Sequence, residues 1–251
     1  MAPISLEEME QVRLMNRIDT KFVTRAEMIL KLLKEATGDY LIQEIDGQRN
    51  MPYFTTYFDT PDADMFYQHQ RGKKNRQKIR TRIYEGTMDL PYLEIKQKNN
   101  KGRTKKKRIL MSEGIELKIY EDFMSNHAAY PHDLLIPHIS NHFYRITLVN
   151  KDRTERITID TDLSFHNLLN ENTYSLPQIA IIEWKREGHI GNSGFGALLR
   201  RLHIHESGFS KYCISQALTN PMLRHNRLNT KLRLIQKLIA KAPDGYDADK
   251  T

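Results

Sequence analysis

Residues 77–85 read QKIRTRIYE, and this stretch carries the pattern on which the expected fold rests. In a β-strand, side chains two positions apart share a face. Lys78, Arg80 and Arg82 therefore lie together on one face, whereas isoleucine and threonine side chains occupy the other. The stretch predicts a strand with one cationic face and one largely apolar face.

The same alternation recurs in the segments that follow. In PYLEIKQK (91–98), Glu94 and Lys96 share one face, and further along Glu183 and Lys185 alternate in the same way. Such segments are short, rich in β-branched and aromatic residues and separated by turn residues, which is typical of an antiparallel sheet. The expected strands are YFTTYFD (53–59), QKIRTRIYE (77–85), PYLEIKQK (91–98), TKKKRILMS (104–112), NHFYRITLV (141–149), RITIDTDLSF (156–165) and QIAIIEWKRE (178–187).

Helices are expected around these strands. Ser5 can cap a helix over residues 5–15, and Thr24 with Glu27 three residues later can start a second one. Apolar spacing predicts the other helices over residues 115–130, 194–205 and 222–241.

A single α+β domain is expected over residues 1–251. Its core covers about residues 13–220, the C-terminal helix covers about residues 222–241, and the polar tail 242–251 is expected to fray. Neither an internal repeat nor a low-complexity linker divides the sequence.

Composition narrows the class of protein. The 251 residues include 39 Lys and Arg against 31 Asp and Glu, a formal net charge of +8, which suggests an anionic partner. The single cysteine excludes a disulfide framework and a multi-cysteine zinc site. Since the sequence shows neither a long apolar stretch nor a secretion signal, we expect a soluble, cytoplasmic protein without a transmembrane segment.

The cationic strand faces need a counter-charge. Taken alone, any one of these strands is most simply explained as a sheet with a solvated face. Many cations side by side on a flat sheet would repel one another, so a sheet that curls around a polyanion explains the joint pattern better. Arginine offers a planar fork to phosphate oxygens and lysine a compact charge, while a single carboxylate among them suits a divalent metal that bridges it to phosphate.

The order of eight short motifs resembles the catalytic domain of the vacuolar transporter chaperone (VTC) polyphosphate polymerases, in its stand-alone bacterial form. No single motif is specific, but together they run in the family's order from Lys21 to Cys213 and cover most of the chain. The motifs are TKF (20–22), YFDT (57–60), KIRTRIYE (78–85), LEIKQKNNKGRTKKKR (93–108), FYRI (143–146), ITIDTDL (157–163), IIEWK (181–185) and FSKYC (209–213).

The resemblance implies a triphosphate tunnel, which is a closed antiparallel eight-stranded β-barrel with helices packed outside. It implies that Glu183 binds a divalent metal, Mn²⁺ or Mg²⁺. The catalytic cations that it implies are Arg80, Arg82, Lys96 and Arg145. The further phosphate-binding residues are Lys21, Lys78, Lys106, Arg108, Lys185, Ser210 and Lys211. The choice of Lys106 over Lys107 rests on its spacing to Arg108.

Two positions depart from related patterns. In the CYTH-type triphosphatases, a related branch, the first strand reads E-x-E-x-K and its acids bind metal, whereas here Arg17 and Asp19 precede Lys21. This change counts against simple triphosphate hydrolysis. The VTC pattern often has a further lysine three residues before the lysine of the SKY motif, and here that position is Gly208.

The implied activity is transfer of the γ-phosphate of ATP onto a phosphate or polyphosphate chain, with loose recognition of the base. The expected ligands are ATP and polyphosphate or another polyanionic phosphate, no nucleic acid is expected, and a membrane-protein partner stays open. Two alternatives remain, an inorganic triphosphatase on the same fold and a non-catalytic polyphosphate- or polyanion-binding module. The cluster KKNRQKIRTR (73–82) also looks like a nucleic-acid patch, but its alternation favours a lined face and aromatic stacking platforms are not interleaved with it.

Overall fold

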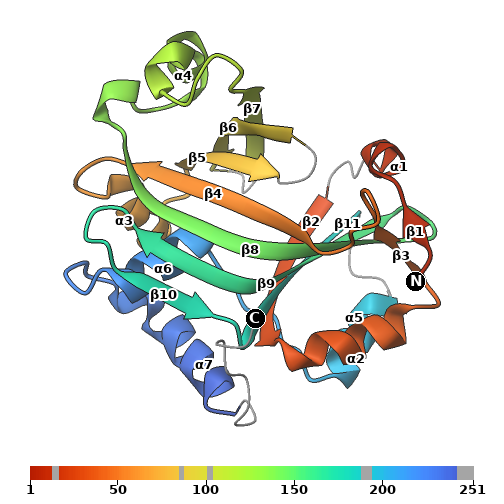
Figure 1. The fold of residues 1–251 in the computed structure, drawn as a ribbon. Coiled ribbons are helices and arrows are strands. Elements are labelled where there is room, and N and C mark those ends of the chain that lie inside the picture. Colours follow the sequence, from red (N-terminus) through yellow and green to blue (C-terminus); the bar gives the residue numbers. More distant parts are fainter. Residues whose placement is uncertain (13–16, 85–87, 101–103, 188–193, 242–251) are drawn as a thin grey trace.

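The computed structural model describes residues 1–12, 17–84, 88–100, 104–187 and 194–241 of this chain. These residues form an α+β fold around one eleven-stranded sheet, with helices on both of its sides (Figure 1). In this part of the chain, no helix is both long enough and apolar enough to span a bilayer.

The main path of the sheet is antiparallel throughout. Its order is β2 (Arg17–Arg25), β11 (Ile179–Glu187), β9 (Glu155–Asn167), β8 (Ile136–Asn150), β4 (Met51–Asp59), β5 (Arg76–Tyr84), β6 (Met88–Lys98) and β7 (Thr104–Leu110). Three short strands extend it, namely β1 (Pro3–Ile4) on β3 (Tyr40–Gln43), β3 on β8, and β10 (Thr173–Leu176) on β9. The expected strands are therefore present, joined in one sheet.

The sheet is not closed by hydrogen bonds, so the expected closed eight-stranded barrel is not supported. β2 and β7 stand at opposite ends of the path and do not pair in the described residues. The free edge of β2 is taken by residues 206–207, because the Ser207 amide donates to the Lys21 carbonyl (2.8 Å) and Glu206 bridges Phe22. At the other end, β7 carries consecutive lysines, which disfavour the docking of another strand.

The sheet nevertheless curls strongly, and in Figure 1 β2 and β11 run steeply across the direction of β4 and β8. Four strands separate Lys21 on β2 from Lys78 on β5 in the sheet order, yet the two lysines bind adjacent residues. The Lys21 Nζ donates to the Phe209 carbonyl (3.2 Å), and the Lys78 Nζ donates to the Ser210 hydroxyl (2.8 Å). The two strands must therefore face each other. We call the concave side that carries Lys21 and Lys78 the inner face.

The outer side of the sheet is covered by two groups of helices. Over β2, β11 and β9 lie α2 (Glu27–Ala36) and α5 (Gly194–Arg201), where Leu32 and Phe195 pack with Trp184. Over β5 and β6 lie α4 (Glu121–His127) and the 3₁₀ turns η1 (Leu117–Tyr120) and η2 (His132–Leu134), with Met124 packed against Ile79. Burial of these apolar faces against helices drives the strands into one layer.

Not every helix lies outside, however. α6 (Lys211–Thr219) packs on the inner face, where Tyr212 stacks on Tyr57 of β4 with ring centroids 5.2 Å apart. α3 (Asp64–Gln70) borders it through Phe66, and α7 (Asn229–Ile239) adds Ile235 to the cluster that contains Phe143. The expectation that all helices pack outside is therefore wrong for α6, because its apolar side fills one end of the inner face.

Some of the helix ends expected from the sequence are present in the structure, and others are not. The Ser5 cap is present on α1 (Leu6–Gln11), where the Glu8 amide donates to the Ser5 hydroxyl (3.2 Å). Thr24 instead lies in β2, and α2 begins at Glu27 without a side-chain cap. The helices expected over 115–130, 194–205 and 222–241 are the shorter α4, α5 and α7, and residues 242–251 lie outside the described residues.

Candidate functional site

The inner face gathers the cations proposed from the sequence. Cross-strand partners of an antiparallel sheet share a face, and the register pairs Lys78 with Lys96 and Lys96 with Lys106. Lys107 pairs with Ile95 of the outer side, so Lys106 is the inward lysine. The inner-face cations are Lys21 (β2), Lys78, Arg80 and Arg82 (β5), Lys96 (β6), Lys106 and Arg108 (β7), Arg145 (β8), Lys185 (β11) and Lys211 (the first residue of α6).

Glu94 on β6 is the carboxylate around which one group of these cations is arranged. Its Oε2 accepts from the Nε (2.8 Å) and Nη2 (2.6 Å) of Arg80, and its Oε1 contacts the Nζ of Lys106 and accepts from the Tyr84 hydroxyl (3.2 Å). Glu94 is 0% exposed. Burial by itself would raise the pKa of this carboxyl, but Arg80, Arg82 and Lys106 outweigh burial and hold the pKa well below its usual value. Glu94 is therefore a permanent internal anion.

Asp160 on β9 organises a second group. Its two oxygens accept from the Nε (2.6 Å) and Nη2 (2.8 Å) of Arg145, and its Oδ2 also contacts the Nζ of Lys211. The Lys211 ammonium lies 3.9 Å from the centroid of the Phe143 ring. Burial lowers the pKa of Lys211 to about 8 although Asp160 acts in the opposite direction. Lys211 thus holds its proton weakly and would hold it more firmly beside an added anion.

Glu183 on β11 stands between two lysines. Its Oε2 contacts the Nζ of Lys185, and its Oε1 lies 3.8 Å from the Nζ of Lys21. Burial would raise the pKa of Glu183, but Lys21, Lys185 and Lys96 hold it well below the usual value. Because Lys96 belongs to β6, its effect on Glu183 spans the inner face. The cross-strand neighbour Thr158 has a buried hydroxyl without a hydrogen-bond partner in the described structure.

Arg82 and Lys96 are buried or half-buried cations without a carboxylate partner in the described part of the chain. The Arg82 Nε donates to the Thr55 hydroxyl (3.0 Å), and its guanidinium lies 5.4 Å from the Tyr53 ring centroid. Burial, then Arg80, lowers the pKa of Arg82. Lys96 makes neither a hydrogen bond nor an ion pair with the described residues, and Arg80, followed by burial, holds its pKa well below the usual value. Glu94 and Glu183 act on these two cations only at longer range, and neither carboxylate forms an ion pair with them in the described residues.

The start of α6 completes the wall beside these cations. The Ser210 hydroxyl caps the helix by accepting from the Cys213 amide (3.3 Å) and also accepts from the Lys78 Nζ (2.8 Å). The cap orients Lys211, which follows it directly, toward Asp160. Arg108 stands at the margin, where it is exposed and lies 4.9 Å from the Tyr92 ring centroid.

β4 supplies lining residues that the sequence analysis did not assign. Tyr53, Thr55 and Tyr57 alternate along the strand and each contacts an arginine of the inner face. The Tyr57 hydroxyl accepts from the Arg80 Nη1 (3.2 Å). Burial would raise the pKa of Tyr57, but Arg80, Arg82, Lys78 and Lys211 together lower it to about 8. The period-two spacing of YFTTYFD was the available signal for this wall.

A further cation reaches the inner face from α7. The Nζ of Lys231 stands 3.3 Å from the place that a β-carbon on Gly208 would take. After burial, the pKa of His69 is lowered by Lys78, Arg76, Lys231 and Lys21, so these groups share one electrostatic environment. An ammonium from α7 thus lies beside Gly208, the position three residues before the lysine of the SKY motif where a further lysine was expected.

Comparison with known protein families identifies the family of this chain. The VTC domain matches residues 16–220. Among solved structures, the PH1819 protein of Pyrococcus horikoshii OT3 is 13% identical with a TM-score of 0.45, and the match covers 80% of this chain and 98% of that one. HpAC1 from Hippeastrum, a protein described with a dominant triphosphatase activity, is 13% identical with a TM-score of 0.48 and coverage of 81% and 96%.

Both TM-scores lie below 0.5, so these distant likenesses support no functional assignment. No curated protein sequence matches the chain. The domain match, in contrast, spans most of the chain and contains every inner-face cation described above except Lys231. The protein therefore belongs to the VTC-domain family.

Proposed function

We propose that this protein extends polyphosphate by transferring the γ-phosphoryl group of a nucleoside triphosphate onto the end of the chain. The observation that carries the proposal is the pair Arg82 and Lys96, which lie among many cations on the inner face without a carboxylate partner in the described residues. A phosphate group would supply the missing negative charge. The VTC domain match supports the same class of chemistry.

In the proposed reaction, a terminal oxygen of the acceptor phosphate attacks the γ-phosphorus. The bond from that phosphorus to the β–γ bridging oxygen breaks, and the nucleoside diphosphate leaves with the electron pair. The attacking oxygen is already ionised, so no general base is needed, and catalysis consists of positioning and charge neutralisation. We assign the neutralisation of the transferring group to Arg80, Arg82, Lys96 and Arg145.

The two carboxylate-bound arginines keep donors available for this task. A guanidinium has five N–H donors. Arg145 directs its Nε and Nη2 to Asp160. Arg80 directs its Nε and Nη2 to Glu94 and one Nη1 donor to the Tyr57 hydroxyl. We propose that the remaining donors face phosphate, while the rest of the triphosphate and the growing chain contact Lys21, Lys78, Lys106, Arg108, Lys185, Ser210 and Lys211.

A divalent ion fits this site only together with phosphate oxygens. The described residues contain no cluster of three or more His, Cys, Asp or Glu that could hold a metal alone. Glu183 offers one carboxylate, and the unpartnered hydroxyl of Thr158 is its cross-strand neighbour, which makes a sparse set of oxygen donors. Mg²⁺ and Mn²⁺ accept such a set when substrate phosphates and water complete it. Bound there, the ion would add positive charge beside the phosphates.

The test is incubation with ATP and Mn²⁺ followed by gel analysis of the products. We expect a ladder of long phosphate chains. Arg82→Ala and Glu183→Ala should each lower its formation by about a hundredfold or more, because Arg82 would neutralise the transferring phosphate and Glu183 would hold the divalent ion. Arg233→Ala, at an exposed position of α7, is the matched control and should leave the ladder unchanged.

Each other result identifies a different function. Release of free phosphate without chains would indicate an inorganic triphosphatase. Binding of polyphosphate without any turnover of ATP would indicate a binding module. Full activity in both Arg82→Ala and Glu183→Ala would overturn the assignment of this face as the active site.

A further inference from the structure

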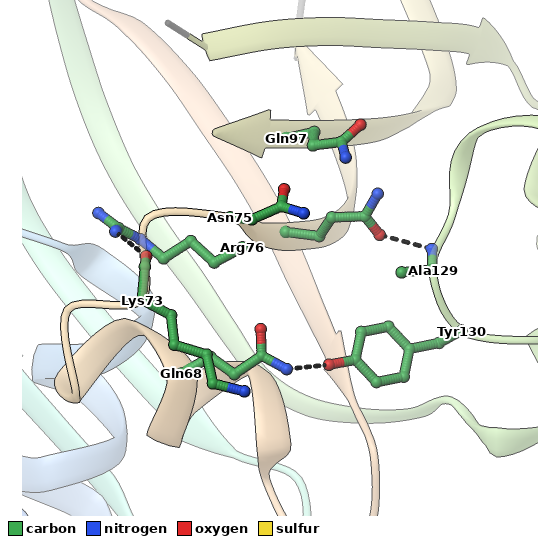
Figure 2. Close-up of a pocket in the computed structure, with 8 residues that line it drawn as sticks. Gln68, Lys73, Asn75, Arg76, Gln97, Ala129 and Tyr130 are labelled. Atoms are coloured by element: carbon green, nitrogen blue, oxygen red, sulfur yellow. Dashed lines mark hydrogen bonds between the residues drawn. The ribbon is translucent and has the colours of Figure 1, made fainter. Parts of the chain in front are cut away.

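The inner face carries further cations beyond Lys78, toward the start of β5. The register pairs Lys78 with Lys96, and the next pair on the same face is Arg76 with Lys98, about 7 Å further along the strands. In Figure 2 the side chain of Arg76 runs away from that of Gln97, which belongs to the outer side. Arg76 and Lys98 are half-buried and form no ion pair with a carboxylate in the residues that the structure describes.

The segment 207–210, which leads into α6, brings three lysines from different elements to this end of the inner face. Lys21 of β2 and Lys78 of β5 donate hydrogen bonds to it (3.2 and 2.8 Å). The Nζ of Lys231 on α7 lies 3.3 Å from the place that a β-carbon on Gly208 would take. Three ammonium groups therefore converge on one short segment, and Lys78 and Lys231 lack an ion pair with a carboxylate in the described structure.

Contacts between α3 and the turn before α7 complete a ring around this end. The Arg227 Nη1 donates to the Arg71 carbonyl (2.9 Å), and the Arg227 amide donates to the Gln70 side chain (3.2 Å). Arg227 lies about one helical turn before Lys231, and residues 71–75 connect α3 to β5. The ring thus passes from β5 through α3 and α7 to the segment 207–210 and back to β5. The exposed cations that it carries are Arg71, Lys73, Lys74, Arg224 and Arg227.

His69 of α3 shows that the cations of this end share one environment. Its Nδ1 is buried and has no hydrogen-bond partner in the described residues. Burial lowers the pKa of His69, and the positive charges of Lys78, Arg76, Lys231 and Lys21 lower it further. The imidazole is therefore neutral, because four cations act on it at once.

The opposite end of β5 has a different chemistry. Tyr84 follows Arg82 on the inner face, and its ring centroid lies 5.0 Å from that of Tyr53 and 5.9 Å from that of Tyr92. Every phosphate of a polyphosphate chain is negatively charged, so the chain is attracted to a row of cations and not to a group of tyrosine rings. The distribution of charge along β5 therefore favours the Arg76 end for a polyanion.

From this asymmetry we propose that the growing polyphosphate chain leaves the inner face between Arg76 and Lys231, where Arg76 and Lys98 hold its outer phosphates. The inference rests on the proposed function, because it assumes that the transferring phosphate binds at Arg82 and Lys96. A chain that is held at both places dissociates less readily, since the second contact forms within the complex. The exposed cations of the ring would attract the part of the chain that has already emerged.

The test compares two probes, inorganic tripolyphosphate and a linear polyphosphate of several tens of phosphates, by calorimetric titration of the full chain in EDTA. The wild-type protein should bind the longer probe more tightly, because only this probe reaches from the central cations to Arg76 and Lys98. In the double variant Arg76→Ala/Lys98→Ala, the Kd for polyphosphate should rise about tenfold, while the Kd for tripolyphosphate stays within about twofold.

The matched control is Lys105→Ala/Lys107→Ala, which removes the same charge from β7. Lys105 pairs with Gln97 and Lys107 with Ile95, so both lysines lie on the outer side of the sheet. Both Kd values should stay within about twofold of the wild-type values. An equal loss of polyphosphate affinity in the two double variants would indicate attraction by net charge alone and overturn the proposed exit.

The remaining outcomes separate this inference from the proposed function. Unchanged polyphosphate affinity in Arg76→Ala/Lys98→Ala would overturn the exit, and so would equal weakening of both probes, which would assign these cations to the central phosphate site. The proposed function survives either result as long as the wild-type protein binds tripolyphosphate, whereas failure to bind it would refute both. In the assay with ATP and Mn²⁺, the ladder of the double variant should shift to shorter chains, because chains dissociate earlier, and an unshifted ladder would also overturn the exit.

Discussion

At the scale of single residues, Glu94 and Asp160 hold the inner-face cations in place without a ligand. Each carboxylate accepts two hydrogen bonds from one arginine and contacts one lysine. Their lowered pKa values follow from that environment. The cations would otherwise repel one another at a depth where water screens poorly. The two acids therefore offset part of this repulsion in the ligand-free protein, whereas Arg82, Lys96 and Lys78 form no ion pair with a carboxylate in the described residues.

Glu94→Gln should separate the contribution of Glu94 to stability from its competition with phosphate for the inner-face cations. The change leaves Arg80 and Lys106 without their counter-charge, so the ligand-free protein should lose about 3 kcal/mol of unfolding free energy. The same change frees donors for phosphate, so the affinity for tripolyphosphate should rise by about tenfold. Thermal unfolding and calorimetric titration measure the two quantities.

The matched control for this variant is Glu121→Gln, at an exposed position of α4. It should alter neither stability nor affinity. A weaker affinity for tripolyphosphate in Glu94→Gln would contradict the view of Glu94 as an internal competitor of phosphate.

At the scale of elements, two helices deliver groups to the site that no strand could provide. α6 begins at the inner face with Ser210 as its cap, so its first residues reach Lys78 of β5 and Asp160 of β9. α7 follows after the turn η3 (Asn226–Leu228) and places Lys231 beside Gly208. The C-terminal helix, which lies outside the matched domain, thus places a cation beside the segment that leads into α6.

Lys231→Ala should weaken the binding of tripolyphosphate by up to about fivefold, because a partly exposed ion pair contributes up to about 1 kcal/mol. Lys237→Ala on the same helix is the control, since that residue is exposed. Titrations at low and high salt should show a smaller salt dependence for Lys231→Ala than for the control. Identical titrations for the two variants would exclude Lys231 from the site.

At the scale of the whole molecule, the excess of positive charge on one curled sheet links stability to pH. The pKa values of Lys106, Lys211 and Tyr57 are each lowered to about 8, whereas in the unfolded chain such groups titrate near pH 10. Between these values the unfolded chain binds more protons than the folded one. These three groups therefore make the free energy of unfolding increase with pH between about pH 8 and pH 10.

We accordingly expect the melting temperature of the ligand-free protein to rise between pH 8 and about pH 9.5. Saturating tripolyphosphate should raise the melting temperature at pH 8 by about 5–10 °C, because binding at a hundred times Kd adds about 2.7 kcal/mol. It should also flatten the rise with pH, because the bound anion keeps the lysines protonated. Differential scanning calorimetry in both states checks this, and a melting temperature that falls over the interval without ligand would contradict it.

Local sequence was sufficient for much of the fold. The alternation in QKIRTRIYE and PYLEIKQK assigned the strands and the shared face of Lys78, Arg80 and Arg82, because the two-residue period of a strand is a local property. The Ser5 cap was likewise predictable from neighbours three residues apart. The family resemblance added the VTC domain, which the domain match over residues 16–220 confirms.

Long-range contacts determine the features of the fold and of the candidate site that local sequence did not predict. The sheet is not closed by hydrogen bonds, and residues 206–207 contact the edge of β2, although their own sequence does not indicate this partner. The pairing of Glu94 with Arg80, the place of α6 inside the curl and the approach of Lys231 depend on register and on chain crossings between distant segments. Short-range periodicity determines which side chains share a face, whereas the folding of the sheet upon itself determines which faces meet.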